Sequence, residues 1–136
     1  MQYPRMNVIY AIHMLSVMKA EMDRMNGVPD VYPLHYIQRK ANLKSLHLLG
    51  QVARVLRING VIRAHKGPIG GYILAKDLDT VTISDLDNEK MGAQKDYPDS
   101  LLMDSLNECL SESTSKYYHT PITSLEGFGV MAMDLE

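Results

Sequence analysis

The apolar residues of this chain change from helical to strand-like spacing at Asn59-Gly60, and this change limits the possible folds more than any other feature. Before it, apolar residues recur at three- and four-residue steps, which predicts helices. After it, VIRAH and YILA have the short, β-branched pattern of strands, and KGPIGG between them has the composition of a turn. The sequence therefore predicts a mainly α fold with one small β-hairpin, in the order helix-turn-helix and then hairpin.

Three helices are expected before the hairpin. The first covers about residues 4–25, with Pro4 in its first turn, where a missing N–H costs nothing. The second is short and runs from Pro33 to about residue 41, and the third covers about 44–58, with Asn59-Gly60 as a left-handed cap. One face of the first helix is expected to be apolar and to comprise Met6, Ile9, Tyr10, His13, Met14, Val17 and Met18.

Two more helices are expected after the hairpin. The segment VTISDLDNEK is predicted to open a fourth helix capped by Thr82 or Ser84, and SLLMDSLNECLSESTSKYYHT a long last helix that ends before Pro121. The tail LEGFGVMAMDLE, residues 125–136, is expected to be loosely held. We divide the chain into a winged helix-turn-helix domain, residues 1–88, and a C-terminal unit, residues 89–136, with a loop, the last helix and the tail. An apolar stripe of the last helix comprises Leu102, Leu106, Cys109 and Leu110.

The small net charge of −2 conceals a strong asymmetry between the two parts of the chain. Residues 1–76 hold eleven Lys/Arg and three Asp/Glu, a net charge of +8, whereas residues 77–136 hold three and thirteen, a net charge of −10. No acid occurs between Asp30 and Asp77. A long acid-free basic block indicates a polyanionic partner, with a solvated basic face as the alternative. The bases of this block are Arg39, Lys40, Lys44, Arg54, Arg57, Arg63, Lys66 and Lys76.

The third helix has two faces of different character when its residues are placed at steps of about 100°. Gly50 lies between the two, and we expect it to let another backbone approach closely. The apolar face, expected in the core, comprises Leu46, Leu49, Val52, Ala53 and Leu56. The polar face has donors of the length needed to contact bases and phosphates in a major groove, with a solvated surface as the alternative, and comprises Lys44, His47, Gln51 and Arg54.

The hairpin turn carries the most specific motif of the chain, Lys66-Gly67-Pro68-Ile69-Gly70-Gly71-Tyr72. Gly70 and Gly71 are expected to supply backbone freedom for a tight turn that Pro68 stiffens, so that Lys66 projects toward a minor groove or a phosphate. With the following Ile-Leu-Ala, this motif resembles the wing of the Rrf-type winged-helix transcription regulators, the family of IscR, NsrR and CymR. The similarity covers about residues 4–88 and includes Tyr10-Ala11, Pro33-Leu34, Leu49, Leu56, Asn59-Gly60-Val61 and VTISDL.

The resemblance implies a homodimeric DNA-binding regulator, with a repressor as our first expectation, in which the long C-terminal helices pair across the dimer. By position it implies DNA contacts from Lys44, Ser45, His47, Gln51 and Lys66. Lys66 replaces the usual wing arginine and so lacks its bidentate geometry, and Ile69 replaces a glycine. Together, the resemblance, the basic block and the wing give these candidate DNA-binding residues: Arg39, Lys40, Lys44, Ser45, His47, Gln51, Arg54, Lys66, Gly67, Pro68, Gly70, Gly71 and Tyr72.

Cluster-binding members of this family hold an iron–sulfur cluster with three cysteines between the fourth helix and the dimer helix. This chain has no cysteine in that region, and its single cysteine, Cys109, follows it. Cys109 alone cannot hold a cluster, so we expect no cofactor and no metal site. The alternative is an iron–sulfur cluster to which His13 and His119 add nitrogen ligands. We assign Cys109 to the dimer seam. His13 is expected to be a core histidine rather than a ligand.

The sequence has no motif typical of an enzyme. Its five histidines lack metal-ligand spacing, and Asp85 and Asp87 would point to different faces of a helix and not converge. No stretch approaches the ~20 apolar residues of a membrane span, and the lone cysteine fits a reducing compartment, so we expect a cytoplasmic protein. The alternative function is a degenerate winged helix that binds another protein and not DNA.

Overall fold

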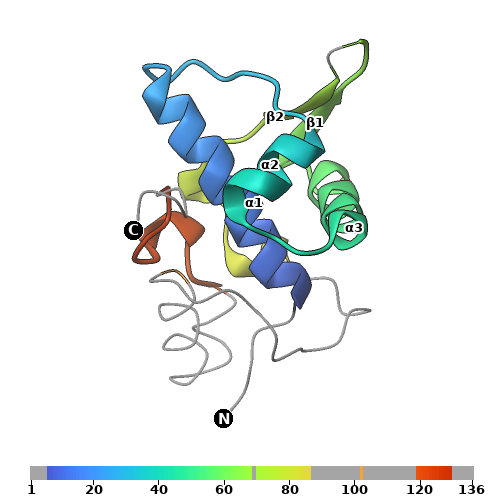
Figure 1. Ribbon diagram of the computed structural model, residues 1–136. Helices are drawn as coiled ribbons and strands as arrows, with labels where there is room; N and C mark the ends of the chain where they lie inside the picture. The colour runs from blue at the N-terminus through green and yellow to red at the C-terminus, as the bar shows by residue number, and fades with distance from the viewer. Residues whose placement is uncertain (1–5, 69, 87–101, 103–118, 130–136) are drawn as a thin grey trace.

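The computed structural model describes residues 6–68, 70–86, 102 and 119–129 (Figure 1). Within them, three helices are followed by a two-stranded hairpin, as the winged-helix prediction requires. The helices are α1 (Met6–Arg24), α2 (Leu34–Ala41) and α3 (Leu46–Ile58), and the strands are β1 (Ile62–His65) and β2 (Gly71–Leu74). Three short 3-10 turns complete the described elements: η1 (Leu78–Thr80), η2 (Ile83–Asp85) and η3 (Ile122–Ser124).

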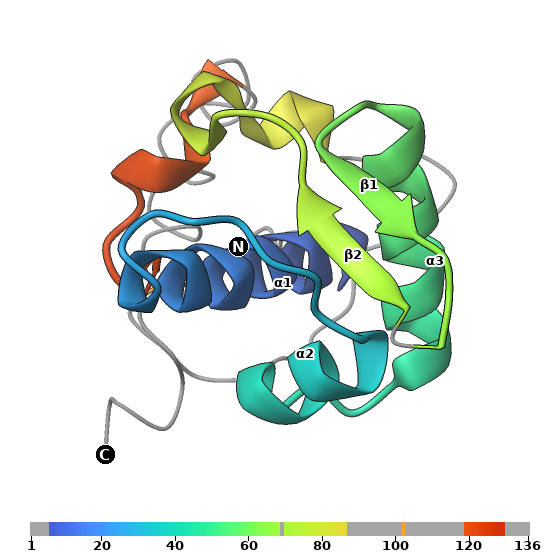
Figure 2. The ribbon, with the colours of Figure 1, turned by 90° about the horizontal axis from the view of Figure 1, so that it is seen from above.

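Helix α1 runs through the centre of the molecule, and both α2 and α3 pack against it (Figure 2). Every residue from Met6 to Met18 is buried, including Asn7, His13 and Ser16. The prediction of one apolar face was therefore too narrow for this helix. A helix that is covered from several sides buries its polar positions as well, and spacing alone does not reveal how many neighbours a helix has.

The turn between α2 and α3 fixes the start of the third helix. Helix α2 ends at Asn42, which adopts the left-handed conformation with φ of 56°. Leu43 is buried, and Ser45 then caps α3, so that Lys44 precedes the helix and does not begin it as predicted. At the other end, Gly60 rather than Asn59 takes the left-handed conformation, with φ of 77°.

The hairpin is antiparallel, with Ile62 opposite Leu74 and His65 opposite Gly71. The segment before α2 adds a short third edge that the sequence pattern did not predict. The N–H of Tyr32 donates to the carbonyl of Tyr72, and the N–H of Tyr72 donates to the carbonyl of Tyr32, both at 2.9 Å. This pair of bonds attaches the base of the hairpin to the start of α2.

Two glycines have different roles from those predicted. A Cβ on Gly71 would lie 2.4 Å from the carbonyl oxygen of Tyr32, so Gly71 is where two backbones meet closely. A Cβ on Gly50 would meet only the Leu34 side chain, at 3.6 Å, so the predicted close backbone approach at Gly50 is wrong. Within the turn, Gly67 takes a positive φ of 135°, a freedom that was assigned to Gly70 and Gly71.

The chain after the hairpin folds back on α1. Thr82 precedes η2, and its N–H donates to the Asp85 carboxylate at 3.0 Å, which supports the predicted cap at Thr82. The element it opens is a single 3-10 turn over the described residues, not an α-helix. The last-helix residues Leu106, Cys109 and Leu110 lie outside the described part of the chain, while Leu102 is buried.

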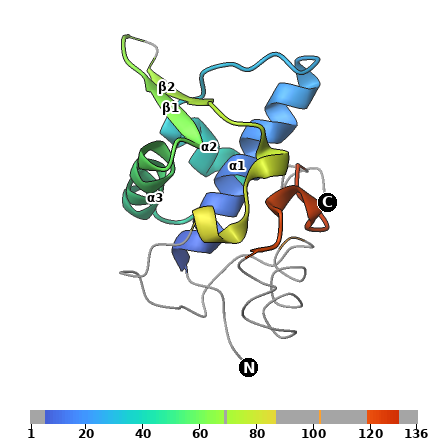
Figure 3. The ribbon, with the colours of Figure 1, turned by 180° about the vertical axis from the view of Figure 1, so that it is seen from behind.

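The segment 119–129 lies beside α1 and the η1–η2 turns (Figure 3). The N–H of Ile83 donates to the carbonyl of Thr120 at 3.1 Å, and that of Ile122 donates to the carbonyl of Val81 at 3.0 Å. Ile122 and Leu125 are buried. The expectation of a loosely held tail is therefore wrong for residues 125–129, because Leu125 joins the core and the N–H of Gly129 donates to the Ser16 hydroxyl of α1.

Candidate nucleic-acid interface

Helix α3 presents a continuous exposed stripe. His47, Gln51 and Arg54 are all exposed, as the predicted polar face requires, and Lys44 is exposed just before the helix. His47 and Gln51 are one helical turn apart, and the Nε2 atom of Gln51 lies 3.3 Å from the Nε2 atom of His47. This contact orients two side chains that have the donors and acceptors to contact base edges.

The two ends of α3 carry exposed apolar side chains. Leu46 is 43% exposed, although it was predicted on the buried face, and Ile58, for which no burial was predicted, is 70% exposed. Arg57 is also exposed beside the stripe. The predicted core positions Leu49, Val52, Ala53 and Leu56 are all buried. Leu46 escapes burial because it is the first residue of α3 and lies at the edge of the apolar face.

The N-terminus of α3 is held in place by α1. The N–H of Ser45 donates to the Tyr10 hydroxyl at 3.0 Å, and the Ser45 hydroxyl accepts a hydrogen bond from the Leu48 N–H, also at 3.0 Å. Ser45 is thus occupied as a helix cap, although its hydroxyl proton remains available for donation. The first N–H groups of a helix have no partner within it, which makes this end suited to a phosphate oxygen.

The wing lies on the same side of the molecule as α3, as the opposite views of Figures 1 and 3 both show. Lys66, Gly67 and Pro68 are exposed at its tip. Gly71 and Tyr72 are half-buried and attach the wing to Tyr32, so they act in the framework rather than at the tip. Gly70 is also half-buried; its Cβ position lies 3.1 Å from the His65 carbonyl oxygen.

A third group of basic residues, after those of α3 and the wing, belongs to α2. Arg39 is exposed, whereas Lys40 is half-buried and its Nζ lies 5.6 Å from the centre of the Tyr36 ring. That ring stacks on Tyr32 with 6.1 Å between centroids. Burial raises the pKa of Tyr36, and a hydrogen bond to Glu21 raises it further, so the hydroxyl stays protonated. Lys40 therefore packs on the Tyr36 ring, whereas the side chain of Arg39 is more exposed to solvent than that of Lys40.

The electrostatic pattern follows the elements. Helices α2 and α3 and both strands lie within the stretch 31–76, which contains no acid. Besides the predicted residues, the structure places Arg57 on α3 and Arg63 on β1 as exposed bases. Both belong to the basic block, and that block was the signal that pointed to them. Among the described residues no group of three or more metal-ligating side chains occurs, and no helix is long and apolar enough to cross a bilayer.

A curated protein shares sequence with this chain. It comes from Aquifex aeolicus (strain VF5), is described as an HTH-type transcriptional regulator, and is 34% identical over 96 residues. The match covers 71% of this chain and 61% of that protein, so the chain spans about three fifths of its relative. A scan against family models gave no match.

Solved structures share the fold. A protein of Listeria innocua described as a transcriptional regulator has a TM-score of 0.59 at 17% identity, covering 92% of this chain and 87% of that one. CymR (YrzC), the global cysteine regulator of B. subtilis, has a TM-score of 0.56 at 18% identity, covering 99% and 96%. IscR of T. potens has a TM-score of 0.54 at 19% identity, covering 98% and 85%.

The fold and the exposed stripe define the class: this chain is a winged-helix protein. Its likeness to CymR and IscR, together with the Aquifex relative, confirms the resemblance to the Rrf-type regulators that the wing motif indicated. These relatives are transcriptional regulators and not enzymes, in agreement with the expectation drawn from the motifs.

Proposed function

We propose that this protein is a DNA-binding transcription regulator that contacts duplex DNA with α3 and the wing. One observation carries the proposal: α3, which bears the exposed polar stripe, and the wing, whose tip holds the exposed Lys66, lie on the same side of the molecule and within the acid-free stretch of the chain. Recognition helices of this kind enter a major groove with their N-terminal residues. The Aquifex relative, a described HTH-type regulator, supports the same function.

The contacts divide into two classes. His47 and Gln51 have the geometry for base edges, whereas Lys44, Arg54 and Lys66 supply charge for phosphates, which contributes affinity without sequence information. Arg39 and Arg57 extend the positive surface on either side. Ser45 holds the helix N-terminus at the position where a phosphate oxygen would be most favoured.

We further propose that the protein acts as a cytoplasmic homodimer and a repressor. Two-fold symmetric helix-turn-helix proteins bind two half-sites about one DNA turn apart, and a single α3 gives a small interface. The proposed dimer contact is the apolar stripe of the last helix at Leu106, Cys109 and Leu110, because Leu102, the first residue of that stripe, is already buried within the single chain at 3% exposed. Sedimentation of the purified protein tests this part, with a mass near twice 15.3 kDa expected.

We propose that no iron–sulfur cluster is bound. Thiolates are the usual ligands of such clusters, and the whole chain has one cysteine, so the donor set does not fit. Visible absorbance of anaerobically purified protein tests this directly. A cluster band that is lost with Cys109→Ser would overturn the proposal.

The function is tested by selection from random duplex DNA, followed by fluorescence titration of the selected sequence at several salt concentrations. A regulator that uses several Lys and Arg residues loses affinity steeply as salt rises. Lys66→Ala is expected to weaken binding by about 1–3 kcal/mol, because it removes the wing contact and leaves the exposed tip folded. Lys76→Ala is the matched control, since it removes the same charge at the other end of the hairpin.

A second candidate function is docking on another protein. The exposed Leu46 and Ile58 at the two ends of the stripe favour it, because apolar side chains there would suit a protein surface. The same titration separates the candidates. No enrichment in the selection and no salt-dependent duplex binding would overturn the DNA proposal and leave the protein contact.

A further inference from the structure

A pocket on the side of α1 away from the recognition helix is not used by the proposed DNA contacts. Its volume is about 330 Å³, within the range of small-molecule sites. It lies between the second half of α1, the loop that leads to α2, and the chain that leaves β2 and enters η1. The lining residues are Lys19, Met22, Pro29, Leu74, Ala75, Lys76, Asp77, Leu78 and Asp79.

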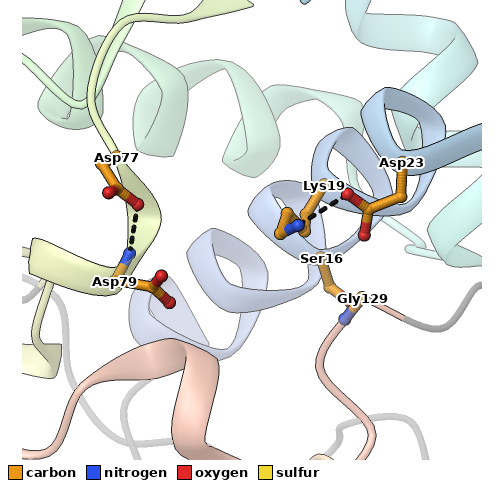
Figure 4. A network of polar contacts seen from close by, with 6 residues as sticks. All are labelled: Ser16, Lys19, Asp23, Asp77, Asp79 and Gly129. Atoms are coloured by element: carbon orange, nitrogen blue, oxygen red, sulfur yellow. Dashed lines mark hydrogen bonds and ion pairs between the residues drawn. The ribbon is translucent and has the colours of Figure 1, made fainter. Parts of the chain in front are cut away.

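The polar groups of this pocket have both signs of charge (Figure 4). Lys19 is already paired with Asp23, at 2.6 Å between Nζ and Oδ1, and the Asp77 carboxylate accepts from the N–H of Asp79 at 3.0 Å. Within the part of the chain that the structure describes, the Asp79 carboxylate and the Lys76 ammonium take part in no hydrogen bond or ion pair. The pocket therefore offers one anion and one cation that no described residue pairs with.

We propose that this pocket binds a small zwitterion with an apolar body, of the class of free amino acids. The ligand's ammonium would pair with Asp79 and its carboxylate with Lys76, while Met22, Pro29 and Leu78 contact the apolar part. A phosphate ester would face the two carboxylates of Asp77 and Asp79. A simple amine would face the two ammonium groups of Lys19 and Lys76. A ligand that carries both charges satisfies the pocket and adds no net charge.

The position of the pocket gives such a ligand a route to the wing. Leu74 is the last residue of β2, and Ala75 donates its N–H to the carbonyl of Val61 at 3.0 Å, directly before β1. A ligand held between α1 and Lys76 would fix the base of the hairpin relative to the helical core. We expect it to change DNA affinity by about fivefold or more, the usual range of such coupling. Only the change in DNA affinity rests on the proposed function; the pocket itself does not.

The site is tested without DNA, by titrating L-leucine into isotope-labelled full-length protein and following backbone amide NMR signals. Shifts at residues 74–79 are expected, with a Kd on the order of 1 mM or tighter. Isoamylamine, which lacks the carboxylate, and isocaproate, which lacks the ammonium, are expected to bind about tenfold more weakly. Equal binding of all three compounds, or no shift with leucine or any other standard amino acid, would overturn the site.

Two exposed substitutions locate the ligand. Lys76→Gln and Asp79→Asn remove one charge each from residues that support no described contact through their side chains, and both are expected to weaken leucine binding about tenfold. The control variants, Lys66→Gln and Glu126→Gln, make the same changes outside the pocket and are expected to bind as the wild type does. Unaltered binding by both pocket variants contradicts the proposal.

The effect on DNA is measured separately, by titrating the selected duplex with and without leucine. A changed Kd in the wild type that is absent in Asp79→Asn supports the coupling. If leucine binds and the DNA Kd is the same, the coupling is overturned and the site stands. If the protein binds no DNA under any condition, the proposed function fails while the NMR titration still decides the pocket.

Discussion

At Gly71 the backbone of the hairpin passes against the backbone of residues 32 and 33, and no side chain fits between them. A Cβ there would lie 2.4 Å from the Tyr32 carbonyl oxygen and 2.7 Å from the Pro33 nitrogen. Neither atom belongs to a flexible side chain that could move away. This contact explains the glycine at position 71 better than turn geometry does, because Gly71 does not take a positive φ.

We predict that Gly71→Ala lowers the free energy of unfolding by about 1–3 kcal/mol, as overpacking usually does. The cost arises because the Tyr32–Tyr72 bonds must lengthen to admit the methyl group. Chemical denaturation measures it. The control is Gly50→Ala, where the nearest atom lies at 3.6 Å and the substitution is expected to stabilise α3 by up to about 1 kcal/mol. Equal effects of the two substitutions would contradict the close approach at Gly71.

His13 is the buried titratable residue of α1. Its Nδ1 lies 2.8 Å from the carbonyl oxygen of Ile9, and its Nε2 has no hydrogen-bond partner among the residues that the structure describes. Burial lowers the pKa of His13 below the ordinary 6.5, and the bond to Ile9 opposes this only in part. The predicted role as a core histidine is therefore confirmed by its position.

We predict that His13 makes the protein less stable as the pH falls below about 6.5. The unfolded chain takes up a proton there that the folded chain does not, so stability falls by up to about 1.4 kcal/mol per pH unit from this group. His13→Phe should remove this part of the slope, as denaturation between about pH 7.5 and about pH 5.5 would show. If the free energy of unfolding depended on pH equally in the wild type and in His13→Phe, His13 would have to accept a proton in the folded state.

At the scale of the element, α3 depends on its cap as much as on its apolar face. Ser45 satisfies the Leu48 N–H through its side chain, and Tyr10 from α1 accepts the N–H of Ser45 itself. The helix is thus positioned by one local bond and one long-range bond. Ser45, which we expected to contact DNA, therefore also has a structural role as the cap of α3.

We predict that Ser45→Ala lowers the free energy of unfolding by about 1 kcal/mol, the usual cost of losing such a cap. Ser45→Asp retains the cap and a favourable charge at the helix N-terminus, so its stability should stay near that of the wild type. Its DNA affinity should fall, because the added carboxylate faces phosphates. Denaturation and duplex titration of the same two variants separate the structural role from the binding role.

The exposed Leu46 gives a further prediction for this helix. Leu46→Ala removes a side chain that is 43% exposed, so it should alter stability little. An apolar side chain at the start of a recognition helix suits the methyl group of thymine. The variant is therefore expected to lose about 1 kcal/mol of preference for one thymine in the selected sequence, a change within the range for single base contacts. A uniform loss over all sequences would exclude this contact.

At the scale of the whole molecule, the described C-terminal segment forms part of the same core as the helices. Besides the bonds between η3 and the η1–η2 region, the N–H of Gly129 donates to the Ser16 hydroxyl on α1 at 2.8 Å. Ile122 is fully buried. The boundary proposed at residue 88 therefore separates parts of the sequence that contact each other in space.

We predict that Ile122→Ala lowers the free energy of unfolding of the whole protein by about 2–5 kcal/mol, as a buried isoleucine cavity does. Because the segment shares the core of α1, helix content and tertiary signals should be lost in one transition. Circular dichroism and fluorescence of the tyrosines measure both. Two separate transitions would show that the C-terminal segment folds by itself, and Ser124→Ala, at an exposed position, is the control.

The sequence by itself determined the order of elements, because the spacing of apolar residues and the turn at Gly60 are local properties. It also determined the polar stripe of His47, Gln51 and Arg54 and the basic tip at Lys66, since helix period and the absence of acids can be counted along the chain. The start of α3, two residues later than predicted at Leu46, follows from the cap at Ser45.

Only the tertiary structure decided how those elements are used. The burial of α1 on all sides, the Tyr32–Tyr72 bridge that makes Gly71 obligatory, and the place of Ile122 in the core all depend on neighbours far apart in sequence. The pocket between α1 and Asp79 has the same origin, because its walls come from two segments, residues 19–29 and 74–79, that are far apart in the sequence. Local pattern sets which face of an element is apolar, but long-range packing sets what covers that face.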